Sequence, residues 1–118
     1  MSKLLLKHEG VILNTYSMTR GVTTIGRNSN NSIQLNDAIA SGHHAKITLT
    51  QNEYLDEQDD ATLEDLTSTN GTQVNGCMIN TVQLRHGDEI KIGSQHFIYE
   101  RDEAVAMDET AIYLPDND

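Results

Sequence analysis

Residues 41–50 read SGHHAKITLT, a small polar turn that runs directly into a segment of alternating apolar and polar residues. From Ala45 to Thr50 every second side chain is apolar. Isoleucine and threonine favour strands because their branched side chains pack well on a pleated surface. Alternation over this length is typical of a strand that buries one face. The stretch therefore predicts a half-buried β-strand preceded by an exposed turn.

The same pattern recurs along most of the chain in short segments rich in Ile, Val, Leu, Thr and Tyr. The other strand candidates are residues 4–7, 11–13, 22–25, 33–35, 53–55, 62–66, 89–92 and 96–99. Turn formers separate them, including the Asn-Gly pairs at 70–71 and 75–76, which are typical of tight hairpins. No segment shows sustained helical periodicity. Many short strands at regular spacing predict an all-β fold, an antiparallel sandwich or barrel.

The chain has 118 residues, which fits one compact domain. Its net charge of -10 is unevenly distributed: residues 1–50 hold five Lys/Arg against two Asp/Glu, and residues 51–118 hold three against sixteen. Nucleic-acid binding relies on clustered cations, so the acidic excess argues against a nucleic-acid partner. It leaves room for one phosphate in a local pocket, because most of the basic residues lie in the first half.

The N-terminal residues and the single cysteine bear on location. Only three consecutive leucines precede Lys7, which is too short for a signal-peptide core or a membrane span. Cys77 has no second cysteine with which to form an internal disulfide, which favours a reducing compartment. We therefore expect a cytoplasmic protein with no membrane partner.

Composition changes near the end of the chain. Residues 101–118 hold six acids against one arginine and have little apolar content. Such a profile is typical of a tail rather than of a packed domain. The predicted organisation is a domain over residues 1–100 and an acidic C-terminal tail over residues 101–118.

Three polar clusters interrupt the apolar strands: Gly26-Arg27, Ser41 to His44, and Ser68 to Thr72. Binding residues concentrate on loops held by a rigid sheet. A guanidinium gives charge-assisted hydrogen bonds to phosphate oxygens, and hydroxyls and backbone N–H groups can add to them. Together the clusters suit a tetrahedral dianion, although their spacing alone leaves open whether they converge. Each cluster alone is equally consistent with a solvated turn.

Catalysis and metal binding are less well supported. His43 and His44 are adjacent on an extended chain and would point to opposite faces, which makes them poor joint metal ligands. Ser41 and His44 could suggest a nucleophile and its base, but we identify neither an acid partner nor an oxyanion element. A phosphate-cradling P-loop and paired catalytic carboxylates are also missing from the sequence. We expect a protein that is not an enzyme, with no cofactor and no metal.

The clusters and their flanking strands resemble the forkhead-associated (FHA) domain family. The resemblance spans roughly residues 3–100 and rests on TIGR (24–27), SIQL (32–35), SGHHA (41–45), DLTSTNGTQVNG (65–76) and LRHGDEIKIG (84–93). It implies a sandwich of two twisted antiparallel sheets with about eleven short strands and recognition loops at one end. It also implies binding of phosphothreonine peptides in preference to phosphoserine.

The resemblance carries over to individual residues. Arg27 and Ser41 would contact the phosphate, Thr69 would add a donor, and Asn70 would bond the peptide main chain. Three further residues would be structural. His44 would form hydrogen bonds within the loop, and Gly26 and Gly71 would adopt backbone conformations that other residues avoid.

The sequence departs from the family pattern after the pocket serine, where Arg or Lys often supplies a second cation. Here that residue is Gly42, and His43 would substitute for the cation only in part. The resemblance predicts a phosphothreonine-binding signalling adaptor that acts downstream of a Ser/Thr kinase. The alternative is an FHA-like interaction scaffold with weak or no phosphate dependence, which Gly42 favours.

Thr110 is a candidate phosphorylation site in the acidic tail, where it follows Asp108 and Glu109. Some small bacterial-type members of the family carry a phosphorylatable threonine in a terminal arm that their own domain captures. By that resemblance, phosphorylated Thr110 would dock at Arg27 of the same or a neighbouring molecule. The plainer interpretation is an acidic end with no such role.

Overall fold

The computed structural model describes residues 2–51 and 59–101. These residues form eleven strands: β1 (Ser2–His8), β2 (Val11–Met18), β3 (Gly21–Gly26), β4 (Ile33–Gln34), β5 (Ala45–Gln51), β6 (Asp59–Asp65), β7 (Thr72–Val74), β8 (Cys77–Ile79), β9 (Thr81–Gln83), β10 (Glu89–Ile92) and β11 (Gln95–Arg101). The described part contains no helix, and so no helix that could span a membrane. The all-β prediction is confirmed. The strand candidate at 53–55 and the tail residues 102–118 lie outside the described residues, so the domain boundary at residue 100 stays a prediction.

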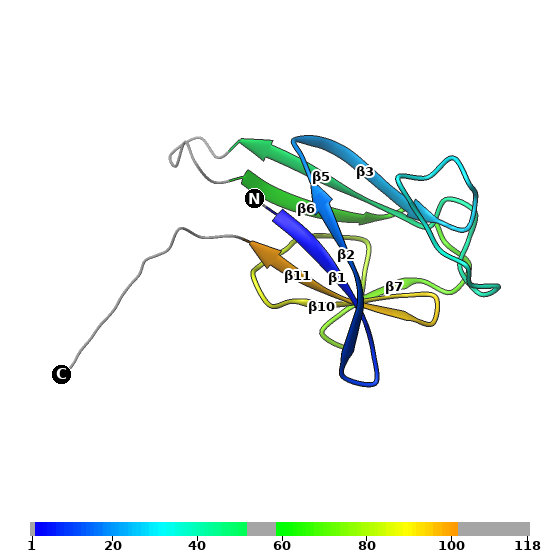
Figure 1. The fold of residues 1–118 in the computed structure, drawn as a ribbon. Helices are drawn as coiled ribbons and strands as arrows, with labels where there is room; N and C mark the ends of the chain where they lie inside the picture. Colours follow the sequence, from blue (N-terminus) through cyan, green and yellow to red (C-terminus); the bar gives the residue numbers. More distant parts are fainter. Residues whose placement is uncertain (1, 52–58, 102–118) are drawn as a thin grey trace.

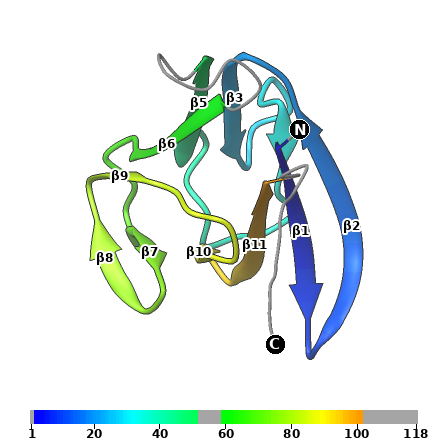
Figure 2. The same ribbon diagram turned by 90° about the vertical axis from the view of Figure 1, so that its left-hand side faces the viewer.

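The strands form two sheets that lie face to face (Figure 1). One sheet has six strands in the order β2-β1-β11-β10-β7-β8, and the other has five in the order β4-β3-β5-β6-β9. The pairings with a described register are antiparallel, apart from the short parallel pair of β3 and β4. Figure 2 shows the two layers from the side, with β3, β5 and β6 opposite β1, β10 and β11. This is the sandwich that the family resemblance implied.

The core lies between the sheets and is built from alternate residues of each strand. In the five-stranded sheet Ile47 faces Leu63 across β5 and β6, and both are fully buried. In the six-stranded sheet Leu4 pairs with Tyr99 across β1 and β11, and both are again fully buried. Burial of a large apolar side chain contributes roughly 1.5–3 kcal/mol. The apolar residues of the alternating segment 45–50 therefore face the core, as the sequence predicted.

Two hairpins close with two-residue turns in which both residues have positive φ. Asn75 and Gly76 join β7 to β8 with φ of 52° and 84°. Glu9 and Gly10 join β1 to β2 with φ of 51° and 81°. Such turns match the right-handed twist of the strands they connect and favour Asn-Gly. The turn predicted at 75–76 is confirmed.

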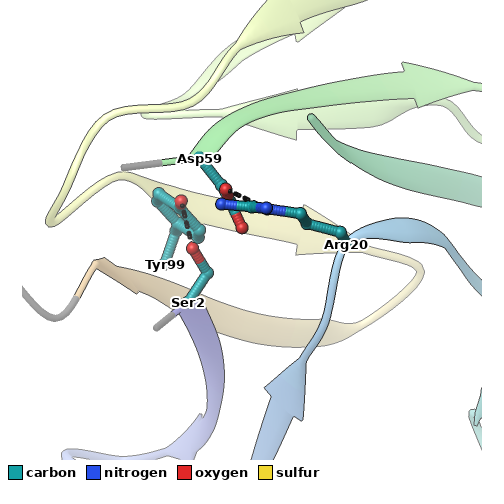
Figure 3. Close-up of polar contacts among 4 residues, drawn as sticks. All are labelled: Ser2, Arg20, Asp59 and Tyr99. Carbon is teal, nitrogen blue, oxygen red and sulfur yellow. Dashed lines mark hydrogen bonds and ion pairs between the residues drawn. The ribbon is translucent and has the colours of Figure 1, made fainter. Parts of the chain in front are cut away.

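Polar contacts tie strand ends together away from the recognition loops (Figure 3). The Ser2 and Tyr99 hydroxyl groups lie 2.9 Å apart and join β1 to β11 in a buried setting. Arg20, in the β2–β3 turn, donates from Nε to Oδ1 of Asp59 at the start of β6, over 2.7 Å. This ion pair links the five-stranded sheet to the end of β2.

Candidate functional site

Three loops meet at one end of the sandwich: the β3–β4 loop (27–32), the β4–β5 loop (35–44) and the β6–β7 loop (66–71). In Figure 1 the cyan and teal segments that join β3 to β5 lie at the right-hand end of the molecule. Arg27 N–H donates to the Ser41 carbonyl over 3.0 Å, which joins the first loop to the second. Leu66 N–H donates to the His44 carbonyl over 2.9 Å, which joins the second to the third. The three polar clusters of the sequence therefore converge.

His44 connects the second and third loops through its side chain. Its Nδ1 accepts a hydrogen bond from the Ser41 backbone N–H over 3.0 Å, and a backbone N–H can only donate. Nδ1 is therefore unprotonated in this bond, and the proton of the neutral ring lies on Nε2. Nε2 donates to the Gly71 carbonyl over 2.8 Å, and the side chain is fully buried. This geometry fits the architectural role that the resemblance implied for His44.

Ser41 is fixed by the loop that carries Thr69. Thr69 N–H donates to the Ser41 Oγ over 3.0 Å, so the serine oxygen accepts a bond and its own proton remains to be donated. Within residues 2–51 and 59–101, neither that proton nor the Thr69 hydroxyl has a side-chain or backbone partner. Two hydroxyl groups at this end of the molecule are thus available to a ligand.

Arg27 and Asn70 both bond to the β4–β5 loop. Arg27 Nη1 donates to the Ala38 carbonyl over 3.3 Å, and Asn70 Nδ2 donates to the Ile39 carbonyl over 2.8 Å. Both side chains are exposed. A guanidinium has five N–H donors and a carboxamide has two donors and an acceptor, so each retains capacity for a ligand. The site combines one guanidinium, two hydroxyl groups and an amide around the β4–β5 loop.

His43 faces the β3–β4 loop through a buried amide that the sequence did not single out. Asn31 is 8% exposed, and its Nδ2 donates to the Asn28 carbonyl over 2.9 Å and to the Gly42 carbonyl over 2.7 Å. Its Oδ1 is left as the acceptor for Nδ1 of His43, 3.1 Å away. The only sequence signal for Asn31 was its place in a tract of turn formers.

Asp65 organises the β6–β7 loop. Its Oδ1 accepts from the hydroxyl groups of Ser68 and Thr72 over 2.5 and 2.7 Å, and its Oδ2 accepts from the Ser68 N–H over 3.1 Å. Burial raises the pKa of Asp65, but the hydrogen bonds from Ser68 and Thr72 outweigh it and hold the pKa below the usual 3.8. The sequence signal was the Asp-x-x-Ser spacing of a side-chain-closed turn.

Asp37 anchors the β4–β5 loop to the β10–β11 turn. Its Oδ2 accepts from the N–H and the hydroxyl of Ser94 over 2.6 and 2.7 Å, and its Oδ1 accepts from the Ile39 N–H over 3.1 Å. The Ser94 hydroxyl contributes most to a lowered pKa of Asp37, against the opposing effect of burial. Sequence reasoning missed this carboxylate because its partner lies 57 residues away.

At two of the glycines a side chain would not fit without a change in the structure. A Cβ at Gly26 would overlap the Gly42 carbonyl and approach the Asn31 amide. Gly71 has φ of +83°, and a Cβ there would lie 2.7 Å from the Met78 sulfur. Backbone conformations with positive φ are adopted readily only by glycine. Gly26 thus allows the β3–β4 and β4–β5 loops to approach closely, and Gly71 serves the backbone conformation of the β6–β7 loop.

Metal-ligating side chains do not gather in this part of the molecule: residues 2–51 and 59–101 contain no cluster of three or more His, Cys, Asp or Glu. His43 and His44 bond different partners, on the β3–β4 and β6–β7 loops respectively. Thr110 lies outside the described residues.

The geometry of the site can now be compared with known proteins. The FHA domain family model matches residues 23–93, more than half of the chain. The chain belongs to the FHA domain family. FHA domains are protein-interaction modules rather than catalytic domains. The family resemblance drawn from the sequence is confirmed.

Similar FHA proteins include mycobacterial ones. This FHA domain is 30% identical over 84 residues to the glycogen accumulation regulator GarA of Mycobacterium tuberculosis. The aligned region covers 71% of this chain and 48% of GarA. The chain thus spans about half the length of the curated relatives it first matches.

Solved structures show the same fold. The FHA domain of FhaA, crystallised in complex with the intracellular domain of Rv3910, is 34% identical, with a TM-score of 0.70 over 85% of this chain and 100% of the other. EmbR of Mycobacterium tuberculosis, in complex with a low affinity phosphopeptide, is 30% identical, with a TM-score of 0.70 over 84% of this chain and 24% of EmbR.

Proposed function

We propose that this FHA domain binds phosphothreonine-containing peptides and acts as a signalling adaptor downstream of a Ser/Thr kinase. The observation that carries the proposal is the convergence of Arg27, Ser41 and Thr69 on one rim, with donor groups left unused. A structure 34% identical to this chain belongs to a study of phosphothreonine-dependent FHA domain interactions, and EmbR binds a phosphopeptide. Both support the proposal by similarity.

Each group has a distinct part in the proposed binding. The Arg27 guanidinium supplies charge-assisted hydrogen bonds to the phosphate. Ser41 donates its hydroxyl proton, because its oxygen already accepts from the Thr69 N–H. The Thr69 hydroxyl supplies another donor, and the Asn70 amide bonds the peptide main chain beside the phosphothreonine. His43 is held toward the β3–β4 loop by Asn31 and would add a ring N–H donor at the rim of the site.

The surrounding hydrogen bonds make the site rigid before a ligand arrives. His44 fixes the distance between Ser41 and Gly71, and Asp65 closes the loop that presents Thr69 and Asn70. A preformed site loses less conformational entropy on binding than a mobile one. This favours a binding role, and we propose that the protein is not an enzyme and acts in the cytoplasm without a cofactor.

The test is fluorescence anisotropy with a degenerate phosphothreonine peptide library, beside matched threonine and phosphoserine libraries. We expect binding of the phosphothreonine library only, and its loss in Arg27→Ala. Arg20→Ala is the matched control. It removes the same charge as Arg27→Ala, but Arg20 directly precedes β3, whereas Arg27 directly follows it. Equal binding of the threonine library, or unchanged binding by Arg27→Ala, would overturn the proposal.

The second candidate is an interaction scaffold with weak or no phosphate dependence. Gly42 favours it, and so does an apolar run on the edge strand β2, where Val11, Ile12 and Leu13 are each more than half exposed. Exposed apolar edge strands can pair with another chain. Salt-insensitive binding of an unphosphorylated partner, unaffected by Arg27→Ala, would favour this candidate over the first.

We also propose that phosphorylated Thr110 is a ligand for the Arg27 site in the same or a neighbouring molecule. Tethering would give an effective concentration of about millimolar, enough to offset a weak site. The test is phosphorylation of the protein by kinases from its source cells, followed by mass spectrometry and by peptide binding. An unmodified Thr110, or full peptide binding after its phosphorylation, would refute this idea.

A further inference from the structure

The side chain of Asn28 occupies the place where a side chain of residue 42 would begin. An ideal Cβ built on Gly42 would lie 2.8 Å from Nδ2 and 3.0 Å from Oδ1 of Asn28. Gly42 does not have a positive φ, so its backbone conformation does not itself require glycine. The Asn28 carboxamide is therefore what stands in the way of a larger residue at position 42.

The backbone of Asn28 is held on both sides. Its N–H donates to the Gly42 carbonyl over 3.1 Å, and its carbonyl accepts from the N–H and the Nδ2 of Asn31 over 3.2 and 2.9 Å. Its side chain, in contrast, is exposed and has no hydrogen-bond partner among residues 2–51 and 59–101. A fixed backbone with an unused amide is a suitable arrangement for binding a ligand, because only one short side chain has to be ordered.

The position of this amide relates it to the phosphate-binding groups. Asn28 follows Arg27 in the chain and contacts Gly42, which itself follows Ser41. It is therefore next in sequence to the residue that carries the guanidinium and contacts the residue next to the one that carries the hydroxyl. An amide Nδ2 has two N–H donors and suits a phosphate oxygen as well as a hydroxyl does.

We propose that the Asn28 side chain donates a hydrogen bond to the phosphate of a bound phosphothreonine, in place of the cation that Arg or Lys would supply at position 42. The proposal rests on the proposed function and names a further residue of the same site. A neutral donor thus replaces a charged one. Glycine at position 42 is what gives this amide its room.

The replacement makes Asn28 and Gly42 interdependent. A lysine at position 42 must push the Asn28 side chain aside, so what the ammonium adds is partly offset by the lost amide. Once Asn28 is truncated to alanine, the three side-chain atoms nearest to the Cβ of that lysine are gone. The effects of the two substitutions on affinity should therefore be strongly non-additive, as is usual for residues in contact.

The experiment measures the affinity of the full chain for the degenerate phosphothreonine library, by anisotropy. Hydrogen bonds to charged groups are the stronger kind, so Asn28→Ala should weaken binding by roughly tenfold or more. Asn28→Asp should weaken it further, because its carboxylate repels the phosphate. Asn30→Ala and Asn30→Asp are matched controls at an exposed position of the same loop and should stay within about twofold, since rim charges act weakly.

Gly42→Lys and the double variant Asn28→Ala/Gly42→Lys complete the cycle. Gly42→Lys should change affinity little in the wild-type background but raise it by roughly tenfold in the Asn28→Ala background. The ¹⁵N–¹H signals of the Asn28 side-chain amide, assigned from their absence in Asn28→Ala, should shift on addition of the library. Unchanged circular dichroism and unfolding midpoints exclude misfolding as the cause.

The outcomes separate this inference from the proposed function. If wild type binds the library but Asn28→Ala and Asn28→Asp bind equally well, the Asn28 assignment is overturned and the function stands. Equal effects of Gly42→Lys in both backgrounds would likewise overturn it. If wild type shows no phosphate-dependent binding, the proposed function fails and the Asn28 assignment fails with it.

Discussion

Replacing His44 should separate the effects of its two side-chain hydrogen bonds, one within the β4–β5 loop and one to the β6–β7 loop. An asparagine can place an acceptor near the position of Nδ1 and keep the bond from the Ser41 N–H. A glutamine can place a donor near the position of Nε2 and keep the bond to the Gly71 carbonyl. Alanine removes both bonds and leaves a cavity where a fully buried ring lay.

The magnitudes follow from the partners that each substitution leaves behind. A buried polar group without a partner costs about 1–3 kcal/mol, so His44→Asn and His44→Gln should each lower the free energy of unfolding by that amount. His44→Ala orphans two groups, which together cost about 2–6 kcal/mol, and the cavity left by the ring adds to that cost. Since a domain is typically stable by about 5–15 kcal/mol, the alanine variant should be close to unfolding.

Equilibrium unfolding in urea measures these differences in the free energy of unfolding. Equal m-values would show that the variants and the wild type expose the same surface on unfolding, so that their free energies can be compared. Nitrogen chemical shifts of the His44 ring should show Nε2 protonated and Nδ1 unprotonated. A proton on Nδ1, or asparagine and glutamine variants both within about 0.5 kcal/mol of wild type, would refute the reasoning.

Three further predictions concern the scaffold. Because the pKa of Asp65 lies below 3.8 in the folded protein, its contribution to stability is present above that value and is lost as pH falls through the folded pKa. Asp65→Asn should therefore be less stable at neutral pH, and should lose less stability than wild type between about pH 5 and pH 2 in urea titrations. Tyr99→Phe should cost about 1–2 kcal/mol by orphaning the buried Ser2 hydroxyl, and adding Ser2→Ala should recover part of that loss; an unaltered unfolding midpoint in Tyr99→Phe would contradict this. The Arg20–Asp59 ion pair is partly exposed, so a double-mutant cycle should give a coupling below about 1 kcal/mol that shrinks in 1 M salt, and a larger, salt-independent coupling would be inconsistent with a surface pair.

Strands with clear alternation could be predicted from the sequence, and very short ones could not. The candidate at 89–92 coincides with β10, and the candidate at 45–50 gives all but the last residue of β5. The three-residue strands β7, β8 and β9 were not predicted. Three residues are too few to distinguish the apolar–polar alternation of a strand from the periodicity of a helix. They form strands because β10 provides a backbone partner for β7, β7 for β8, and β6 for β9.

The length of β2 could not be predicted from the sequence either. Its apolar run at 11–13 predicted a short strand, but the strand continues through a mostly polar stretch to Met18. The backbone of that stretch pairs with residues 2–6 of β1. Pairing with a buried neighbour thus extends a strand beyond its apolar pattern.

For the site, the family resemblance named Arg27, Ser41 and Thr69, but the contacts that hold them were beyond reach. Asn31 bonds to Gly42 eleven positions away, and Asp37 bonds to Ser94 fifty-seven positions away. Nothing local distinguishes these two residues from other turn formers. Their roles come from the packing of loops that only the folded sheets bring together.

The bond between Asp37 and Ser94 makes the recognition site depend on a turn far along the chain. It joins residues 57 positions apart, and such long-range contacts form slowly because their loops cost entropy to close. A nascent or partly unfolded chain would therefore lack the complete site. A ligand that binds only the complete site would in turn stabilise the whole domain, in proportion to the logarithm of its concentration.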